Sequence, residues 1–125
     1  MRILIVEDSK FVQNVIRKVI LENIPNCEVL TANDGESGFK LYMEYKPDLI
    51  TSDLLMPILS GQEMLKKIRE IDNETKIIVI SADVQKATRD EIEELGIVGF
   101  INKPVIGDKV DLLMNLIKEA QLNVE

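Results

Sequence analysis

Each of four short apolar runs in this sequence is followed by side chains whose types suit catalysis or metal binding. Asp53 follows the run Leu49–Ser52. The runs Ile3–Val6, Ile77–Ile80 and Phe100–Asn102 lead into Glu7 and Asp8, into Ser81 and into Lys103, respectively. If these runs are parallel strands of one sheet, their carboxyl ends share one edge, where open α/β sheets bind ligands. Three carboxylates, a hydroxyl and an ammonium would meet there, which suits a magnesium ion and a phosphoryl group.

The acidic residues of this group predict a metal site. Crowded carboxylates raise one another's pKa unless a cation neutralises them. Mg²⁺ fits because it binds through one or two carboxylates, keeps several waters and recruits phosphate oxygens. Taken alone, Glu7 and Asp8 are explained better as acidic residues at a helix N-terminus. Together with Asp53, 45 positions later, they favour the metal site.

Asp53 is the predicted phosphate acceptor, because a carboxylate can attack phosphorus and form an acyl phosphate. Lys103 would place a fixed positive charge against the phosphoryl oxygens, and Ser81 would offer them a hydroxyl. Taken singly, Lys103 is an ordinary surface lysine and Ser81 is a common helix cap. The prediction therefore depends on all of them following different strands.

The elements that must position these residues alternate between apolar runs typical of strands and helical patterns. This alternation is typical of βαβ units around a parallel sheet, and we expect five strands and five helices in one domain. A fifth strand is expected at Glu28–Ala32, ending in an Asn33-Asp34-Gly35 turn. The first expected helix starts near Ser9 and stops before Pro25, and the second runs from Gly35 to about Tyr45. The third follows Gly61, and the fourth covers Val84–Leu95. The fifth occupies the C-terminal region to Gln121, after which the tail is expected to fray.

Periodic apolar residues indicate which helix faces are buried. The first helix carries Phe11, Val12, Val15, Ile16, Val19 and Ile20, the third Met64, Leu65, Ile68 and Ile71, and the last Val110, Leu113, Met114 and Ile117. The segment Val84–Leu95 has only Ala87, Ile92 and Leu95 as candidates for burial. We therefore expect this helix to have low local stability, with Gly96 as its left-handed cap.

Composition excludes several classes of function. The 125 residues are 46% hydrophobic, carry a net charge of −7 and contain no histidine. The charge argues against direct nucleic-acid binding, and the lack of histidine excludes histidine-based nucleophile activation. No apolar stretch is long enough to span a membrane, and the first strand leaves no room for a signal peptide. The single Cys27 favours a reducing compartment, so a cytoplasmic location is expected.

The motifs Ile5-Val6-Glu7-Asp8, Asp53 with Met56-Pro57 and Gly61, Ser81-Ala82, and Lys103-Pro104 occur in the order and spacing of a known family. On these residues the chain resembles a response-regulator receiver domain of two-component systems, similar to the single-domain chemotaxis type. The resemblance covers nearly the whole chain and implies a flavodoxin-like doubly wound fold with strand order 2-1-3-4-5, which is known for that type. Residues 1–125 would then be a single receiver domain.

The resemblance also implies roles for individual residues. Asp53 would be phosphorylated with Mg²⁺ held by Glu7, Asp8, Asp53 and the backbone carbonyl of Leu55. Lys103 would contact the phosphate, and a cis Lys103–Pro104 bond is to be expected. Ser81 and Phe100 would form the switch, although phenylalanine lacks the phenolic oxygen of the chemotaxis type's tyrosine.

Partners follow from the same resemblance. A histidine kinase or phosphotransfer protein would donate the phosphoryl group, and a downstream protein would bind around Val84–Leu95, Phe100 and the last helix. The chain would be a monomer or a phosphorylation-dependent dimer. It would catalyse only its own phosphorylation and dephosphorylation. It would be either a free shuttle or a piece of a longer regulator.

Three other functions are compatible with parts of the sequence. A flavodoxin-like small-molecule module needs a phosphate-cradling loop after the first strand, where Glu7 and Asp8 would repel phosphate. Such a protein would also be yellow when purified. A degenerate receiver acting as a constitutive scaffold is the second alternative, although the key side chains are all present. A metal-dependent phosphatase would need a further acid–base group near Asp53.

Overall fold

Five parallel strands form the central sheet of the computed structural model, which describes residues 1–82 and 85–124. Their order across the sheet is β2-β1-β3-β4-β5. The strands are β1 (Arg2–Val6), β2 (Glu28–Ala32), β3 (Leu49–Ser52), β4 (Lys76–Ser81) and β5 (Gly99–Asn102). This flavodoxin-like arrangement confirms the predicted fold class, because the order reverses beside β1 as in doubly wound sheets.

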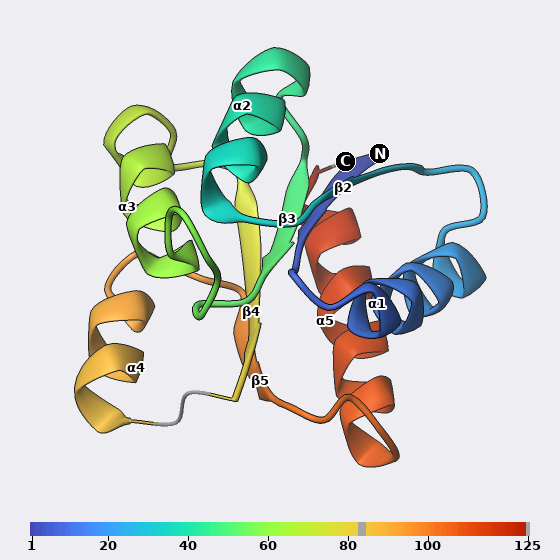
Figure 1. Cartoon of the computed structure of the whole chain (residues 1–125). Coiled ribbons are helices and arrows are strands. Elements are labelled where there is room, and N and C mark those ends of the chain that lie inside the picture. The colour runs from blue at the N-terminus through green and yellow to red at the C-terminus, as the bar shows by residue number, and fades with distance from the viewer. Residues whose placement is uncertain (83–84, 125) are drawn as a thin grey trace.

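Five helices alternate with the strands and cover both faces of the sheet (Figure 1). They are α1 (Lys10–Asn23), α2 (Gly35–Tyr45), α3 (Gly61–Ile71), α4 (Lys86–Glu93) and α5 (Asp108–Val124). Helices α1 and α5 lie on one face, and α2, α3 and α4 lie on the other. The result is a three-layer α/β/α sandwich.

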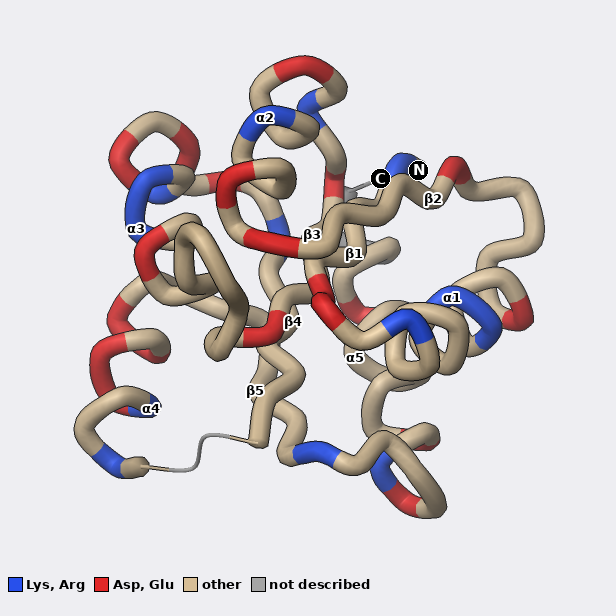
Figure 2. Tube along the Cα trace, in the orientation of Figure 1, with Lys and Arg blue, Asp and Glu red and all other residues tan. Residues whose placement is uncertain are grey.

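Alternating strand residues supply the two halves of the core. On β1, Ile3 and Ile5 pack against α1 and α5, whereas Leu4 and Val6 pack against α2 and α3. Because successive strand side chains point to opposite faces, a strand covered on both sides must be apolar throughout. The central strands meet this condition, and Figure 2 shows the charged residues mainly on helices, loops and strand ends.

Side-chain caps determine where three helices begin. Ser9, Asp34 and Ser60 accept hydrogen bonds from the backbone N–H groups of Val12, Ser37 and Glu63, respectively. Each cap satisfies an N–H group that has no partner inside its helix. The loops that leave β1, β2 and β3 are therefore short and end at defined positions.

The predicted helix ends agree with the structure in several places. α1 ends before Pro25, and Gly96 has a φ of 76° after α4, as expected of a left-handed cap. α5 continues to Val124. None of the helices in the described part of the chain has the length and apolar character that a bilayer crossing requires.

Four expectations about buried faces and helix bounds were wrong or lie outside the described residues. Phe11, the second residue of α1, is 78% exposed, and Ile71, the last residue of α3, is 58% exposed. Ala87 is also exposed, which leaves Ile92 as the one buried side chain of α4. α4 begins at Lys86 and ends at Glu93, so it is shorter than the predicted helix. Val84, the predicted start, lies outside the described residues.

Candidate functional site

The carboxyl ends of β1, β3, β4 and β5 meet at one edge of the sheet, as predicted. Strand pairing continues just beyond them: the Asp53 N–H donates to the Val6 carbonyl (3.1 Å), and the Lys103 N–H donates to the Ser81 carbonyl (3.1 Å). These backbone hydrogen bonds place Asp53 beside the Glu7–Asp8 turn. They also place Lys103 next to the end of β4.

Lys103 connects the two buried carboxylates of the site. Its Nζ lies 2.7 Å from Asp53 Oδ2 and 2.6 Å from Glu7 Oε1. Glu7 is 1% exposed and Asp53 6% exposed, so both charges are largely removed from water. A single ammonium thus serves two carboxylates, which is closer contact than the sequence alone indicated.

The pKa values of Glu7 and Lys103 are both raised, for different reasons. Burial raises the pKa of the Glu7 carboxyl, and hydrogen bonding to Lys103 only partly offsets this effect. Burial alone would lower the pKa of Lys103, but its hydrogen bonds to Asp53 and Glu7 outweigh burial and raise it. Lys103 therefore remains a fixed cation at neutral pH.

The second oxygen of Asp53 is held by backbone groups. Asp53 Oδ1 accepts hydrogen bonds from the N–H groups of Leu54 (2.6 Å) and Leu55 (3.3 Å). The start of α3 approaches the same residue so closely that a Cβ on Gly61 would lie 1.8 Å from the Asp53 carbonyl oxygen. Asp53 is thus constrained on both its side chain and its backbone.

The acidic cluster has the composition expected of a hard-cation site. Carboxylate oxygens of Glu7, Asp8 and Asp53 lie within 4.8 Å of one another. Asp8 is exposed, whereas Glu7 Oε2 accepts from the Ser9 N–H at 2.9 Å and Oε1 binds Lys103. One ammonium leaves this group of three carboxylates with excess negative charge. The residues present therefore fit Mg²⁺, which prefers oxygen ligands.

The two predicted switch residues lie on neighbouring strands. Ser81 is fully buried at the end of β4, and Phe100 on β5 is partly buried against the cluster formed with α2, α3 and α4. The guanidinium carbon of Arg89 lies 4.9 Å from the centre of the Phe100 ring. This distance is within the range of cation–π contacts, so α4 touches Phe100 directly. The predicted cis Lys103–Pro104 peptide bond is confirmed.

One polar residue of the site was missed in the sequence. Gln13 lies on the buried face of α1, 4% exposed, and its Nε2 donates to the Glu7 carbonyl oxygen at 2.5 Å. The available signal was a carboxamide three residues before Ile16 on an otherwise apolar stripe. Its partner, a backbone carbonyl of another loop, cannot be identified from a sequence pattern.

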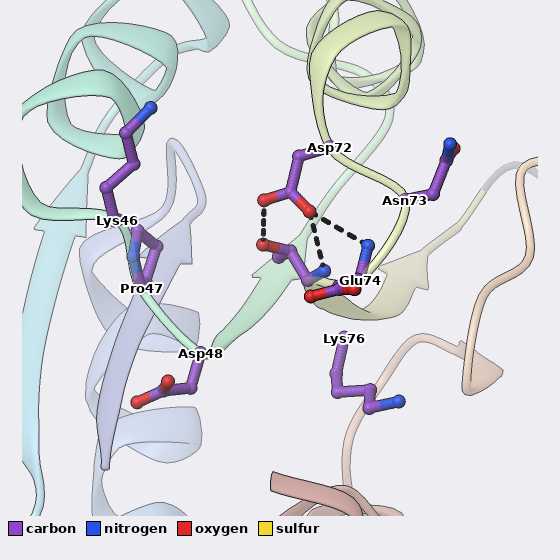
Figure 3. A pocket seen from close by; sticks show the side chains of 8 residues that line it. Lys46, Pro47, Asp48, Asp72, Asn73, Glu74 and Lys76 are labelled. Carbon is purple, nitrogen blue, oxygen red and sulfur yellow. Dashed lines mark hydrogen bonds between the residues drawn. The ribbon is translucent and has the colours of Figure 1, made fainter.

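The opposite edge of the sheet has a different character. A hollow of about 530 Å³ lies between the loops that precede β3 and β4 (Figure 3). Asp72 beside it accepts hydrogen bonds from Glu74 N (2.8 Å), Thr75 N (3.1 Å), Thr75 Oγ1 (2.6 Å) and Tyr42 Oη (2.7 Å). These bonds satisfy the carboxylate within the fold and give it a structural role in the turn.

Comparison with known proteins places this geometry in context. Residues 3–118 match the family model described as "Response regulator receiver domain". The chemotaxis protein CheY of Bacillus subtilis is 36% identical over 110 residues, covering 87% of this chain and 90% of that protein. A protein-glutamate methylesterase/protein-glutamine glutaminase of Bacillus licheniformis is 35% identical over 113 residues, which cover 89% of this chain but only 31% of that longer protein.

A solved structure agrees with these sequence matches. The response regulator domain of Thermotoga maritima CheB superposes with a TM-score of 0.81 at 32% identity, covering 98% of this chain and 95% of that one. The match extends over nearly the whole sandwich, including the edge where Asp53 and Lys103 lie.

Proposed function

The chain belongs to the response-regulator receiver family, and from that premise we propose that it is a switch in which Asp53 accepts a phosphoryl group in a Mg²⁺-dependent reaction. Membership of the family implies phosphorylation-dependent signalling. The observation that supports the specific residue is the position of Asp53, held by Lys103 on one oxygen and by two backbone N–H groups on the other.

Glu7, Asp8 and Asp53 would hold the ion, together with the backbone carbonyl of Leu55. Mg²⁺ bound there would neutralise the carboxylates and draw charge from the oxygens of the incoming phosphoryl group. Because the three carboxylates crowd one edge with a single ammonium, the site has excess negative charge that a divalent cation would offset.

The residues of the chain itself account for the transfer. A carboxylate oxygen of Asp53 forms a bond to phosphorus while the bond from phosphorus to the imidazole nitrogen of a phosphohistidine donor breaks. The donor imidazole carries a proton on its other ring nitrogen before the bond breaks, so it leaves as a neutral base. Lys103 then balances charge on the phosphoryl oxygens, which is the positioning and electrostatic contribution that phosphoryl transfer requires.

The donor in this proposal is a histidine kinase or a phosphotransfer protein, because the chain has no histidine of its own. The signal would leave through Ser81, Phe100, helix α4 and the C-terminal helix α5, which would bind a downstream protein as a monomer or as a phosphorylation-dependent dimer. The protein would act in the cytoplasm, in a chemotaxis pathway or another phosphorelay pathway. It would catalyse only its own phosphorylation and dephosphorylation. Residues 1–125 would function as one domain.

Intact-mass measurement with acetyl phosphate as donor tests this function. Wild type should gain one phosphoryl group in Mg²⁺ and none in chelator, and Asp53→Asn should gain none in either condition. Asp111→Asn, which removes an exposed carboxylate of α5, is the matched control and should label like wild type. Equal labelling of Asp53→Asn and wild type would reject Asp53 as the acceptor.

A further inference from the structure

Gln13 connects two loops next to the metal-binding carboxylates. Besides the Glu7 carbonyl oxygen, its Nε2 donates to Asn33 Oδ1 at 2.8 Å, and it approaches the Ala32 carbonyl oxygen at 3.4 Å. A primary amide has two N–H donors. They are used here by the Glu7 carbonyl and by the side chain of Asn33, which belong to the loops after β1 and β2.

The Glu7 carbonyl is an informative place for such a bond. Its oxygen lies in the peptide plane that joins Glu7 to Asp8, and that plane is rigid. The Glu7 N–H also donates to the carbonyl of Ala32, the last residue of β2, at 2.9 Å. One side of Glu7 is therefore bound to β2, and the other is bound through Gln13 to Asn33 in the loop that follows. Fixing this peptide fixes the direction in which the chain leaves toward the exposed Asp8.

The start of α2, two residues after Asn33, is bound to the segment that follows Asp53. The Gly35 N–H donates to the Leu59 carbonyl at 3.0 Å, and a Cβ on Gly35 would lie 2.2 Å from that oxygen. Contacts therefore run from Gln13 through Asn33 and Gly35 to the loop after β3. The relative position of Asp8 and Asp53 depends on this frame.

We propose that Gln13 is a positioning residue that holds the Glu7–Asp8 peptide so that Asp8 faces Asp53 across the divalent-cation site. This inference rests on the proposed Mg²⁺-dependent function. Gln13 touches neither the ion nor the phosphoryl group in this proposal and acts only through the backbone of Glu7. Groups that orient metal ligands from outside the ligand set commonly matter about 10–100-fold for metal affinity.

Gln13→Met tests the proposal because methionine has a similar shape but no N–H donor. Tyr42→Phe is the matched control, since it deletes one partly buried hydrogen bond, to Asp72, at the other edge of the sheet. Mg²⁺ is titrated into each metal-free protein and followed by amide chemical shifts. We expect about tenfold weaker Mg²⁺ binding in Gln13→Met, at the lower end of the range for such residues, and unchanged binding in Tyr42→Phe.

A labelling experiment separates positioning from general damage to the fold. With acetyl phosphate, Gln13→Met should need more Mg²⁺ for half-maximal labelling but should reach the wild-type rate at saturating Mg²⁺. A lower maximal rate with an unchanged Mg²⁺ requirement would overturn the proposal, because the defect would then lie at Asp53.

A milder pair of variants covers the case in which Gln13→Met does not fold. Asn33→Ala removes one acceptor of the Gln13 amide from an exposed loop, and Asn73→Ala alters an exposed loop asparagine at the other edge. Asn33→Ala should weaken Mg²⁺ binding about threefold, in proportion to one lost hydrogen bond of modest strength, and Asn73→Ala should not.

The outcomes distinguish this inference from the function on which it rests. If wild type binds Mg²⁺ and both Gln13→Met and Asn33→Ala bind it within twofold of wild type, the positioning role is wrong and the proposed function stands. If wild type itself binds no Mg²⁺ and is not labelled, the proposed function fails and this inference fails with it.

Discussion

At the scale of single residues, the negative charge of Asp53 is repelled by the neighbouring carboxylates of Glu7 and Asp8. One ammonium serves Glu7 and Asp53, while Asp8 adds a further negative charge nearby. Lys103 would keep Glu7 as a partner if the charge on Asp53 were removed. The loss of that charge therefore relieves repulsion without leaving a buried cation unpaired, which is the usual cost of breaking an ion pair.

Asp53→Asn should accordingly stabilise the metal-free protein by about 1–2 kcal/mol, the scale of close like-charge interactions in a partly buried site. In a domain of this size that is a rise of a few degrees in Tm. Thermal melts in chelator measure it, with Asp111→Asn as the control. Mg²⁺ should stabilise wild type by mass action and the variant less. A lower Tm for Asp53→Asn in chelator would contradict the picture of three carboxylates sharing one strained pocket.

The buried hydroxyl of Thr51 is a second feature that lowers the stability of the fold. Its Oγ1 is buried on β3 without a hydrogen-bond partner among the described residues. A buried hydroxyl that makes no hydrogen bond loses the solvation it has in the unfolded chain.

Thr51→Val keeps the shape and removes the hydroxyl, so the free energy of unfolding should rise by about 1 kcal/mol. Urea denaturation of the two proteins gives the difference. Thr31→Val, at an exposed position of β2, is the control and should change stability less. A destabilised Thr51→Val would mean that the hydroxyl does find a partner.

At the scale of elements, α4 differs from the other helices in how it is held. Ile92 is its one buried side chain. Other contacts of α4 are the stacking of Arg89 on the Phe100 ring and the bonds from Glu91 to Lys66 and Gln62 of α3. Arg69 donates to the carbonyl oxygens of Leu95 and Gly96, just after the helix. Few buried apolar contacts give an element a low local free energy of opening.

Hydrogen exchange with and without beryllofluoride, a phosphoryl mimic, should therefore show changes at Ser81, α4 and Phe100. The amides of α1 should stay nearly unchanged, because Ile16, Val19 and Ile20 are buried in the core formed with the sheet and α5. Asp53→Asn treated in the same way is the control and should show no response. Changes spread evenly over all helices would argue against α4 as the moving element.

Sequence patterns predicted most of the strands and helices, but they did not predict every buried face or the contacts between strands. Strand runs and capping residues predicted the sheet and most helix bounds, because burial on two faces and unpaired N–H groups act locally. Periodicity misassigned Phe11 and Ile71, since a helical stripe does not show whether neighbouring elements cover the helix at its ends. The shared contact of Lys103 with Glu7 and Asp53 depends on side-chain direction across three strands, which no local pattern contains.

At the scale of the whole molecule, the two edges of the sheet have separate tasks. The carboxyl edge collects the charges of the proposed ion site, whereas Asp72 and its partners close the amino edge. Burial alone would raise the pKa of Asp72, but hydrogen bonds from Thr75, Tyr42 and the backbone hold it well below its usual range. The Tyr42 hydroxyl beside it has its pKa raised to about 12, first by burial and then by Asp72.

A depressed carboxyl pKa stabilises the fold above the unfolded-state value of 3.8, and this contribution is lost as the pH falls below it. Asp72→Asn should be less stable than wild type by about 1 kcal/mol at neutral pH, and the gap should narrow as the pH falls below 3.8 toward the depressed folded-state pKa of Asp72. Urea midpoints at neutral pH and across a series of pH values below 3.8 measure this. Because the edges are separate, Mg²⁺ affinity should not change. A gap that stays constant with pH would show that the charge of Asp72 is not the cause.

Gly61 bears no functional group, yet its tolerance to mutation should match that of Asp53. Any side chain there would collide with the Asp53 carbonyl at 1.8 Å and with the Leu54 Cα at 3.0 Å. In a saturation screen selected for signalling, even alanine at this position would therefore score as a loss-of-function allele, through displacement of the acceptor and not through lost chemistry. Such a screen would group Gly61 with Asp53, the proposed acceptor, and the close approach of the two backbones would explain the grouping.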